Sequence, residues 1–321
     1  MKKIVDDIRL IFKCCSLYYD DGLNQQEISD ILQISRPSVA RMIKSGHENG
    51  IVKIEVINPD NVAFGNLERE IEKKFGLSEV IIAASGNAAL TDAINEDIAK
   101  ETFKFLSRVI EDKDFVGVTM GRTLLNLLQG HYAVESKKCT FVPIMGGMDE
   151  NRYDIHSNYV AMSFAKVFHA DCLQFFAPLV FSKPDMLKQF LEEYSMQRIV
   201  KAFKKISIVV MGIGVSAKET STLVKAGYIS EELFDKFIEL GMVGDAAAQF
   251  YDRNGSTEQF ASFNHLIAAM PIDDLKKVRC RVGIAAGKNK LESLLGAIKG
   301  KIINVLITDS ESAEDLLNYK E

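Results

Sequence analysis

The sequence predicts an α/β protein, in which a small N-terminal helical module precedes a larger domain built on a mostly parallel sheet. Its 321 residues are enough for about two domains. Apolar residues recur at helical spacing up to about residue 45, and beyond residue 65 β-branched apolar runs alternate with helical stretches. A composition of 47% hydrophobic and 26% charged residues excludes a disordered or collagen-like chain. We therefore expect residues 1–56 to form the first domain and residues 57–321 the second.

Signals for membrane insertion, secretion and metal binding are missing from the sequence. No uncharged apolar run reaches the roughly 18 residues of a membrane span, and Asp6, Asp7 and Arg9 interrupt any signal core at the start. The five cysteines form no CxxC spacing and the five histidines form no HExxH motif, so a disulfide framework, a zinc ribbon and a metal enzyme are not indicated. We expect a cytoplasmic protein with reduced thiols, no metal, no cofactor and no membrane contact.

Three helices are predicted in the first domain. The first covers about residues 4–20, the second follows Asn24 as its N-cap, and the third opens after Ser35 and runs to about Ser45. The second helix is expected to bury three apolar residues, Ile28, Ile31 and Leu32. The alternating, β-branched run at residues 50–57 then predicts a strand or small wing.

The third of these helices has an apolar side and a polar, basic side when residues are placed 100° apart. The apolar side holds Val39, Ala40 and Ile43. The opposite side holds Pro37, Ser38, Arg41, Lys44 and Ser45. Together with the three-residue turn that precedes it, this pattern predicts a winged helix-turn-helix, whose last helix enters the major groove of DNA.

The residues of this module that face outward are candidates for DNA contact. Ser38 and Arg41 are placed to read base edges, and Lys44 and the helix N-terminus are placed to hold phosphates. Residues 1–54 carry a net charge of +1, whereas the rest of the chain carries −6. The candidate DNA-binding residues are Gln25, Gln26, Ser35, Arg36, Pro37, Ser38, Arg41 and Lys44. The alternative is a three-helix bundle with a solvated basic face.

Five apolar segments of the second domain predict the strands of a Rossmann-like α/β fold. They are FVGVT at 115, FVPIM at 141, ISIVVMGIG at 206, VGIAAG at 282 and IINVLITD at 302. Near-continuous apolar strands are typical of a parallel sheet with helices on both faces. A helix over about residues 66–75 is expected before them.

Glycine-bearing turns follow four of these strands, at the edge where open parallel sheets bind ligands. A helix start with a guanidinium and a hydroxyl, or a mobile lysine, suits an anion. Asp245, within GMVGDAAAQFYDRNG, offers an acceptor for sugar hydroxyls. The candidate ligand-binding residues are Gly121, Arg122, Thr123, Gly146, Gly147, Gly212, Gly214, Asp245 and Lys290. Alternatively, each glycine serves a tight turn and Asp245 is a helix cap or an exposed loop acid.

The run LYYDDGLNQQEISDILQISRPSVARMIKSGHENGIVKIEV resembles the N-terminal helix-turn-helix of the SorC family of bacterial sugar-responsive transcriptional regulators. The shared elements are the Tyr18–Tyr19 pair, QxEI at 25–28, ISRPSVxR at 34–41 and the GIV turn into the wing. The segments GVTMGRTL, VPIMGG, MGIGV, GMVGDAAAQFYDRNG, AAGKNK and INVLITDSESAEDLL are similar to the effector-binding domain of the same family. The resemblance therefore covers nearly the whole chain.

This resemblance implies a regulator of a carbohydrate-catabolism operon. Such a protein binds operator DNA as a homo-oligomer, a dimer or tetramer, and responds to a sugar or phosphorylated sugar. Its second domain is similar in fold to sugar-phosphate isomerases and glucosamine-phosphate deaminases. By position, Gly121, Arg122 and Thr123 with Lys290 take the anionic end of the effector, and Asp245 takes its hydroxyls. The chain departs from the family pattern at Ala286, where a glycine is usual before the lysine turn, and at Met242 in the GAVGD-like element. We expect Met242 to alter the width of the pocket.

Two enzyme interpretations compete with the regulator. The segment MGIGVSA fits a GxGxxA dinucleotide fingerprint, but no helix of adequate apolar period and no second strand ending in an acid follow it. A sugar-phosphate isomerase or deaminase with Asp245 as base agrees with the fold resemblance but leaves the helix-turn-helix without a purpose. We therefore expect a regulator and not an enzyme.

Overall fold

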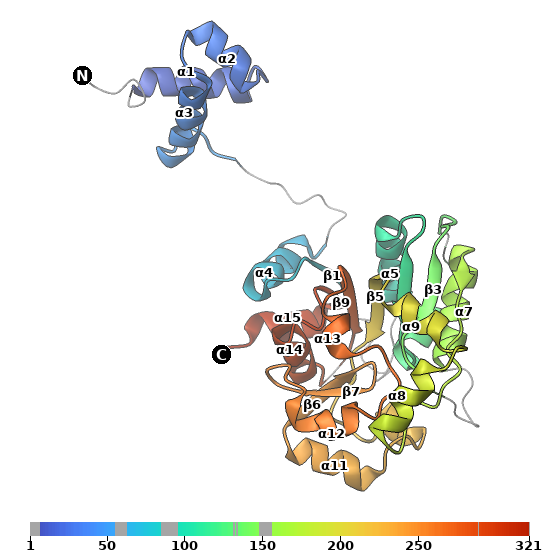
Figure 1. Ribbon diagram of the computed structural model, residues 1–321. Helices are drawn as coiled ribbons and strands as arrows, with labels where there is room; N and C mark the ends of the chain where they lie inside the picture. Colours follow the sequence, from blue (N-terminus) through green and yellow to red (C-terminus); the bar gives the residue numbers. More distant parts are fainter. Residues whose placement is uncertain are drawn as a thin grey trace. The chain divides into compact units, whose positions relative to one another are not determined.

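The computed structural model describes residues 7–54, 63–84, 96–130, 132, 134–147, 156–287 and 289–320 (Figure 1). The chain forms two compact units, Met1–Asn61 and Val62–Glu321. The predicted boundary between residues 56 and 57 lies outside the described residues. Each unit has a hydrophobic core of its own.

The N-terminal unit packs three helices, α1 (Ile8–Tyr19), α2 (Gln25–Leu32) and α3 (Arg36–Glu48). Asn24 caps α2 by accepting from the amides of Gln26 and Glu27, and the Glu27 side chain accepts from the Asn24 amide in return. Ser35 caps α3. The core of the unit consists of Ile11, Cys14, Cys15, Ile28, Val39, Met42 and Ile43. The predicted three helices and both caps are confirmed.

Two details predicted for this unit are wrong. Ile31 is 54% exposed, because α2 turns Ile28 and Leu32 toward the core and leaves Ile31 to one side. Residues 51–54 form no strand, because the amides of Ile51 and Val52 both donate to the carbonyl of Gly46 and close the end of α3. Residues 55–57, the rest of the predicted wing, lie outside the described residues.

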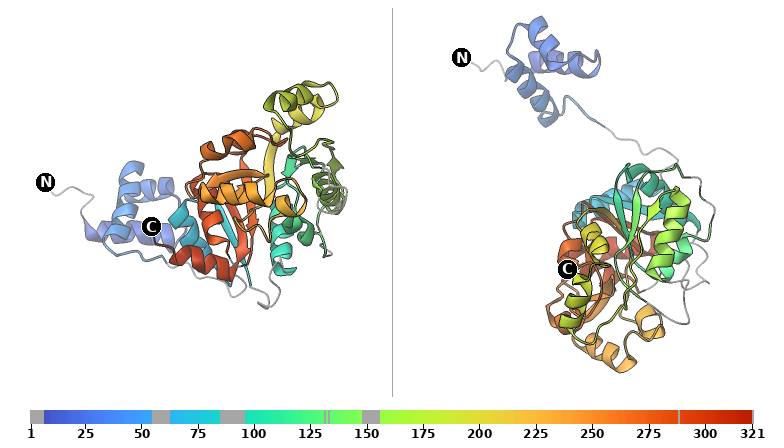
Figure 2. Two further views of the ribbon diagram at one scale, coloured as in Figure 1. Left: turned by 90° about the horizontal axis from the view of Figure 1, so that it is seen from below. Right: turned by 45° about the vertical axis from the view of Figure 1, so that its right-hand side comes forward.

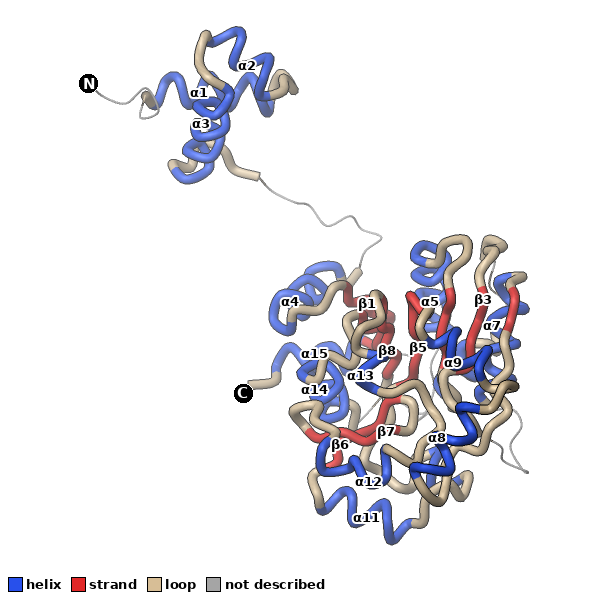
Figure 3. Tube along the Cα trace, viewed as in Figure 1, coloured by secondary structure: helices blue, strands red, loops and turns tan. Residues whose placement is uncertain are grey.

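The C-terminal unit is built on a parallel sheet of seven strands in the order β1-β9-β8-β5-β2-β3-β4 (Figure 3). Its strands are β1 (Glu79–Ala83), β2 (Phe115–Val118), β3 (Thr140–Pro143), β4 (Asp171–Cys172), β5 (Ile206–Gly212), β8 (Cys280–Ala285) and β9 (Val305–Asp309). From β2 the chain proceeds outward to β3 and β4, and then returns to place β5 on the other side of β2. The order of the strands therefore reverses between β2 and β5, which is where sheets of this kind bind ligands.

Helices cover both faces of this sheet (Figure 2). One face packs against α5 (Glu96–Val109), α6 (Arg122–Leu127) and α7 (Ser157–Phe168). The other face packs against α4 (Gly65–Phe75), α9 (Gln197–Phe203), α11 (Glu231–Glu239), α14 (Leu291–Lys299) and α15 (Ser310–Asn318). Strand β5 contributes to both cores, since Ile208 and Val210 face one and Val209 and Met211 face the other. The predicted Rossmann-like, three-layer α/β architecture is confirmed.

Shorter elements complete the unit. The helices are α8 (Pro184–Glu192), α10 (Thr222–Lys225), α12 (Ala261–Asn264) and α13 (Ile272–Leu275), with a 3-10 turn at Glu258–Phe260. Strands β6 (Met242–Ala246) and β7 (Gln249–Asp252) form a separate antiparallel hairpin. The sequence patterns indicated neither this hairpin nor the two outer strands β1 and β4.

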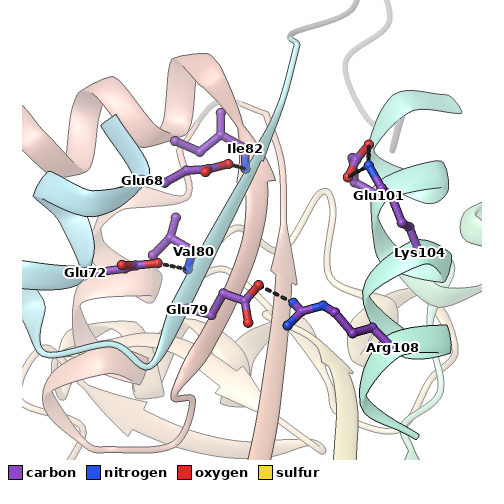
Figure 4. Close-up of polar contacts among 8 residues, drawn as sticks. All are labelled: Glu68, Glu72, Glu79, Val80, Ile82, Glu101, Lys104 and Arg108. Atoms are coloured by element: carbon purple, nitrogen blue, oxygen red, sulfur yellow. Dashed lines mark hydrogen bonds and ion pairs between the residues drawn. The ribbon is translucent and has the colours of Figure 1, made fainter. Parts of the chain in front are cut away.

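The free edge of β1 is covered by carboxylates from α4 (Figure 4). Glu68 accepts from the amide of Ile82 at 2.9 Å, and Glu72 accepts from the amide of Val80 at 3.1 Å. The other edge of β1 pairs with β9. Two amides that an edge strand would leave open are thereby satisfied, which blocks the pairing of this edge with another chain.

Candidate effector site and DNA-binding face

A cavity of about 410 Å³ lies at the carboxyl ends of the central strands. Its walls come from the segments that follow β2 and β5, from the turn after β8, from the β6–β7 hairpin and from α10 with the turn before it. The cavity lies where the strand order reverses, between β2 and β5. A cavity of this volume and position fits a small ligand.

Seven of the nine predicted effector residues line this cavity. They are Gly121, Arg122, Thr123, Gly212, Gly214, Asp245 and Lys290. Gly146 and Gly147 do not line it within the described part of the chain. Gly146 packs against the backbone instead, because a Cβ there would lie 2.7 Å from the carbonyl oxygen of Ala177. Met242 does not line the cavity either and is buried, so its effect on the width of the pocket stays a prediction.

Gly212 at the end of β5 and Gly214 just after it make room for side chains of the site. A Cβ on Gly214 would lie 1.9 Å from Oδ1 of Asp245, and a Cβ on Gly212 would lie 3.0 Å from Cβ of Thr123. The amide of Gly214 also donates to the carbonyl of Asp245 at 2.9 Å. A side chain on Gly214 would displace the Asp245 carboxylate, and a side chain on Gly212 would crowd Thr123, so both glycines leave room for these groups.

Asp245 belongs to strand β6 and lies opposite Phe250 in the hairpin. The two turn residues, Ala247 and Ala248, both have left-handed backbone conformations, with φ of 50° and 61°, as a two-residue hairpin turn requires. Burial raises the pKa of the Asp245 carboxyl to about 6, although a bond from the Ala248 amide and the charge of Lys290 lower it. Asp245 is thus neither a helix cap nor an exposed loop acid.

Two cations approach the cavity from different elements. The Arg122 guanidinium donates to the carbonyl of Thr220 at 2.9 Å, and the Lys290 ammonium donates to the carbonyl of Ile213 at 2.9 Å. Arg122 is the first residue of α6, and Lys290 precedes α14. Both side chains are partly buried. A guanidinium and an ammonium at one cavity form a site that favours an anionic group.

The turn that carries Lys290 is held by Asp309 at the end of β9. The amide of Gly287 donates to Oδ2 of Asp309 at 2.6 Å, and the amide of Ser312 donates to Oδ1 at 2.7 Å. Asp309 therefore caps α15 and fixes the strand β8 turn with the same carboxylate. Sequence reasoning quoted the segments that contain Ala247, Ala248 and Asp309 but assigned these three residues no role, because alanine offers no polar side chain and Asp309 ends a strand that no glycine-bearing turn follows.

The candidate DNA-binding residues gather on α2 and α3 of the N-terminal unit. Arg36, Arg41 and Lys44 are exposed on α3. Arg41 and Lys44 lie on the side away from the buried Val39 and Ile43, and Arg36 lies at the start of the helix. A chain of contacts orders the start of this helix. The hydroxyls of Ser35 and Ser38 lie 2.8 Å apart, and Arg41 donates to Ser38 and to the carbonyl of Pro37.

The starts of α2 and α3 meet at a shallow hollow of the N-terminal unit. It is lined by Tyr18, Asn24, Gln25, Gln26 and Arg36. The guanidinium of Arg36 suits a DNA phosphate at this place. Tyr18 and Asn24 were not among the predicted DNA-binding residues, although Tyr18 belongs to the tyrosine pair of the motif.

Membrane and metal features can be judged within the described ranges. No helix there is both long and apolar enough to cross a bilayer. Among the same residues, no group of three or more His, Cys, Asp or Glu side chains is arranged to hold a metal ion.

The geometry defines a class of protein, namely one that joins a helix-turn-helix unit to an α/β unit with a ligand cavity. The family described as "Putative sugar-binding domain" matches residues 62–318. The sorbitol operon regulator of Klebsiella pneumoniae is 30% identical over 97% of this chain and 98% of its own. The deoxyribonucleoside regulator of Bacillus subtilis is 28% identical over 97% of both chains.

Solved structures agree with these relatives. The full-length sorbitol operon regulator SorC of Klebsiella pneumoniae superposes with a TM-score of 0.70 at 30% identity, over 98% of this chain and 100% of that one. A transcriptional regulator of Streptococcus pneumoniae, at 22% identity, has the same fold with a TM-score of 0.72 over 81% of this chain. The chain belongs to the SorC family of sugar-binding transcriptional regulators. The prediction of a regulator and not an enzyme is confirmed by these relatives.

Proposed function

We propose that this transcriptional regulator binds operator DNA through the exposed face of α3 and is controlled by a sugar or phosphorylated sugar in the cavity of its C-terminal unit. One observation carries the proposal. The cavity where the strand order reverses brings Arg122, Lys290 and Asp245 together in a chain that also holds a helix-turn-helix. The operon that it regulates encodes proteins of carbohydrate catabolism.

The anionic end of the effector binds to Gly121, Arg122, Thr123 and Lys290. Arg122 and Lys290 each donate to a neutral main-chain carbonyl in the structure. A phosphate adds a full negative charge to the hydrogen-bond acceptor, so it competes well with a neutral carbonyl for both cations. Asp245 accepts from the hydroxyls of the sugar. The names of the relatives, which refer to sorbitol and deoxyribonucleosides, support an effector of this size and polarity.

The DNA-binding unit acts in pairs. A helix-turn-helix reads one half-site, and two copies on the same face of the duplex bind half-sites about one helical turn apart. We therefore place the protein in the cytoplasm, where operator DNA lies, as a dimer or tetramer. Ser38 and Arg41 read bases, and Gln25, Gln26, Ser35, Arg36, Pro37 and Lys44 contact the backbone or support the helix that does so.

A crossed pair of variants tests this assignment of two surfaces. Arg41→Ala is expected to weaken binding to DNA from upstream of the protein's own gene by about tenfold or more while leaving sugar-phosphate binding unchanged. Lys290→Ala is expected to weaken sugar-phosphate binding while leaving the affinity for DNA unchanged. Fluorescence anisotropy measures the first affinity, and calorimetry with glucose 6-phosphate, sorbitol 6-phosphate and 2-deoxyribose 5-phosphate measures the second.

The controls are charge-matched changes at exposed positions of the C-terminal unit. Arg198→Ala on α9 and Lys236→Ala on α11 lie outside the cavity and are expected to alter neither affinity. If Arg41→Ala bound operator as the wild type does, α3 would not be the recognition helix. Product formation from any of these sugar phosphates, followed by NMR, would favour the isomerase or deaminase alternative.

A further inference from the structure

Thr119 is a buried residue of the cavity wall whose hydroxyl is unpaired. It directly follows β2, at the reversal point of the sheet, and its amide donates to the carbonyl of Val210 at 3.3 Å. The residue is 2% exposed and lines the cavity. Its Oγ1 atom has no hydrogen-bond partner among the residues that the structure describes.

The next residue, Met120, has an amide with a poor partner. This amide donates to the thioether sulfur of Met145 at 3.5 Å, and a thioether is a weak acceptor. Met120 and Met145 also line the cavity. Two adjacent donors at the end of β2 therefore have no oxygen partner within the described ranges.

Unpaired buried hydroxyls are rare in folded proteins, and each one calls for an explanation. Valine has nearly the same shape as threonine and would avoid the cost of burying an unpaired hydroxyl. Groups that break this rule are expected at functional sites, where a ligand completes the hydrogen bonds. The position of Thr119 on the cavity wall fits that explanation, whereas a purely structural role does not use the hydroxyl.

We propose that the Thr119 hydroxyl and the Met120 amide bind one uncharged oxygen of the effector. The inference rests on the proposed function. It adds a third group of effector contacts to the two already proposed, which are the contacts with the anionic end and the contacts of Asp245 with sugar hydroxyls. Both groups donate, so their partner is an acceptor oxygen, either a carbonyl or a hydroxyl of the carbohydrate chain. A small turn of the threonine side chain brings its hydroxyl to this oxygen, and the weak bond from Met120 to the Met145 sulfur is exchanged for a stronger one.

The test uses the full-length variants Thr119→Val and Thr119→Ser. With the sugar phosphate that the wild type binds among glucose 6-phosphate, sorbitol 6-phosphate and 2-deoxyribose 5-phosphate, Thr119→Val is expected to lose about tenfold in affinity. Thr119→Ser, which retains the hydroxyl, is expected to bind within about threefold of wild type. Inorganic phosphate, which reaches only the anionic end, is expected to bind all three proteins equally.

Thermal unfolding without ligand separates this role from a structural one. Thr119→Val is expected to melt at or above the wild-type temperature, because it removes an unpaired buried hydroxyl. Equal affinity of Thr119→Val and wild type for the sugar phosphate overturns the subsite, and so does an equal loss in Thr119→Ser or a matching loss for inorganic phosphate. If Lys290→Ala still loses binding in those cases, the proposed function stands without the subsite. If the wild type binds none of the compounds, the proposed function fails first.

Discussion

The carboxyl group of Asp245 is placed so that small changes in pH alter its charge. Burial raises its pKa to about 6, against an ordinary value of 3.8, and this effect outweighs the Ala248 amide and the charge of Lys290. Near neutral pH the group is mostly ionised, which suits an acceptor for hydroxyls. The ionised form is nevertheless costly in the ligand-free protein, because the folded state holds the proton more tightly than the unfolded chain.

The stability of the protein is therefore expected to depend on Asp245 between about pH 4 and pH 6. Below about pH 4 the carboxyl is protonated in both states and its favourable contribution is fully present. As the pH rises through about 6 that contribution is lost. Asp245→Asn, which stays neutral, should be more stable than wild type at pH 7.5, and the difference should shrink as the pH falls to 4.

Urea unfolding at a series of pH values measures this effect. Asp171→Asn, at an exposed position on β4, is the matched control and is expected to change the unfolding free energy by no more than about 0.5 kcal/mol. A constant difference between Asp245→Asn and wild type from pH 4 to pH 8 would contradict the assignment.

Single residues of the site were predictable from sequence where they lie in a recognisable motif. Arg122, Thr123 and Lys290 follow strand ends in glycine-bearing turns, and they line the cavity. Thr119 carries no such signal, since an unpaired hydroxyl is a property of the packed structure and not of a local pattern. Gly146 was predicted to bind ligand but packs against a neighbouring backbone. A sequence alone does not distinguish these two uses of glycine, since both need the absence of a side chain.

At the scale of elements, α4 protects the sheet by means of two carboxylates. Glu68 and Glu72 accept from alternate amides of β1, and Arg108 of α5 pairs with Glu79 on the same strand (Figure 4). Burial raises the pKa of Glu68, and the nearby carboxylates of Glu72, Glu101 and Glu79 add to this, whereas the bond from Ile82 lowers it. The hydrogen bond that Glu68 accepts thus contributes more to the stability of the fold than the negative charge of Glu68 does.

A pair of substitutions at this position separates the acceptor from the charge. Glu68→Ala leaves the Ile82 amide without its partner and is expected to cost about 1–3 kcal/mol of unfolding free energy. Glu68→Gln keeps an acceptor oxygen, so its loss is expected to be clearly smaller. Denaturant unfolding measures both, and Glu70→Ala, at an exposed position of the same helix, is the control. Equal losses for Ala and Gln would mean that the charge, not the acceptor, is what stabilises the edge.

Long, continuously apolar strands were predictable because both of their faces are buried, as in β5 and β8. The two-residue strand β4 offers too little sequence for any periodicity. The β6–β7 hairpin lacks the usual turn signal, since Ala247 and Ala248 occupy positions where Asn and Gly are normally found. Residues 51–54 form no strand for another reason, because the amides of Ile51 and Val52 close α3 instead of pairing with a strand.

For the whole molecule, the division into two units means that DNA and effector affect each other only through a coupling free energy. By linkage, the factor by which effector changes operator affinity must equal the factor by which operator changes effector affinity. We expect a factor of about 5 to 150. Calorimetric titration of the bound sugar phosphate, with and without saturating operator DNA, measures one factor, and anisotropy with and without effector measures the other.

The two factors should agree in size and direction at the same salt concentration, which must be held constant because DNA affinity depends steeply on it. Thr119→Ser is a suitable control, since it is expected to preserve both factors. An operator affinity that changes with effector, together with an effector affinity that ignores operator, would show that the two events are not at equilibrium in one complex.

The β6–β7 hairpin stands outside the ladder of parallel strands, yet it supplies Asp245, Ala247 and Ala248 to the cavity. The hairpin shares no strand pairing with the seven-stranded sheet. A few substitutions in this hairpin can therefore change which carbohydrate the protein recognises during evolution, while the parallel sheet and the helix-turn-helix unit stay unchanged.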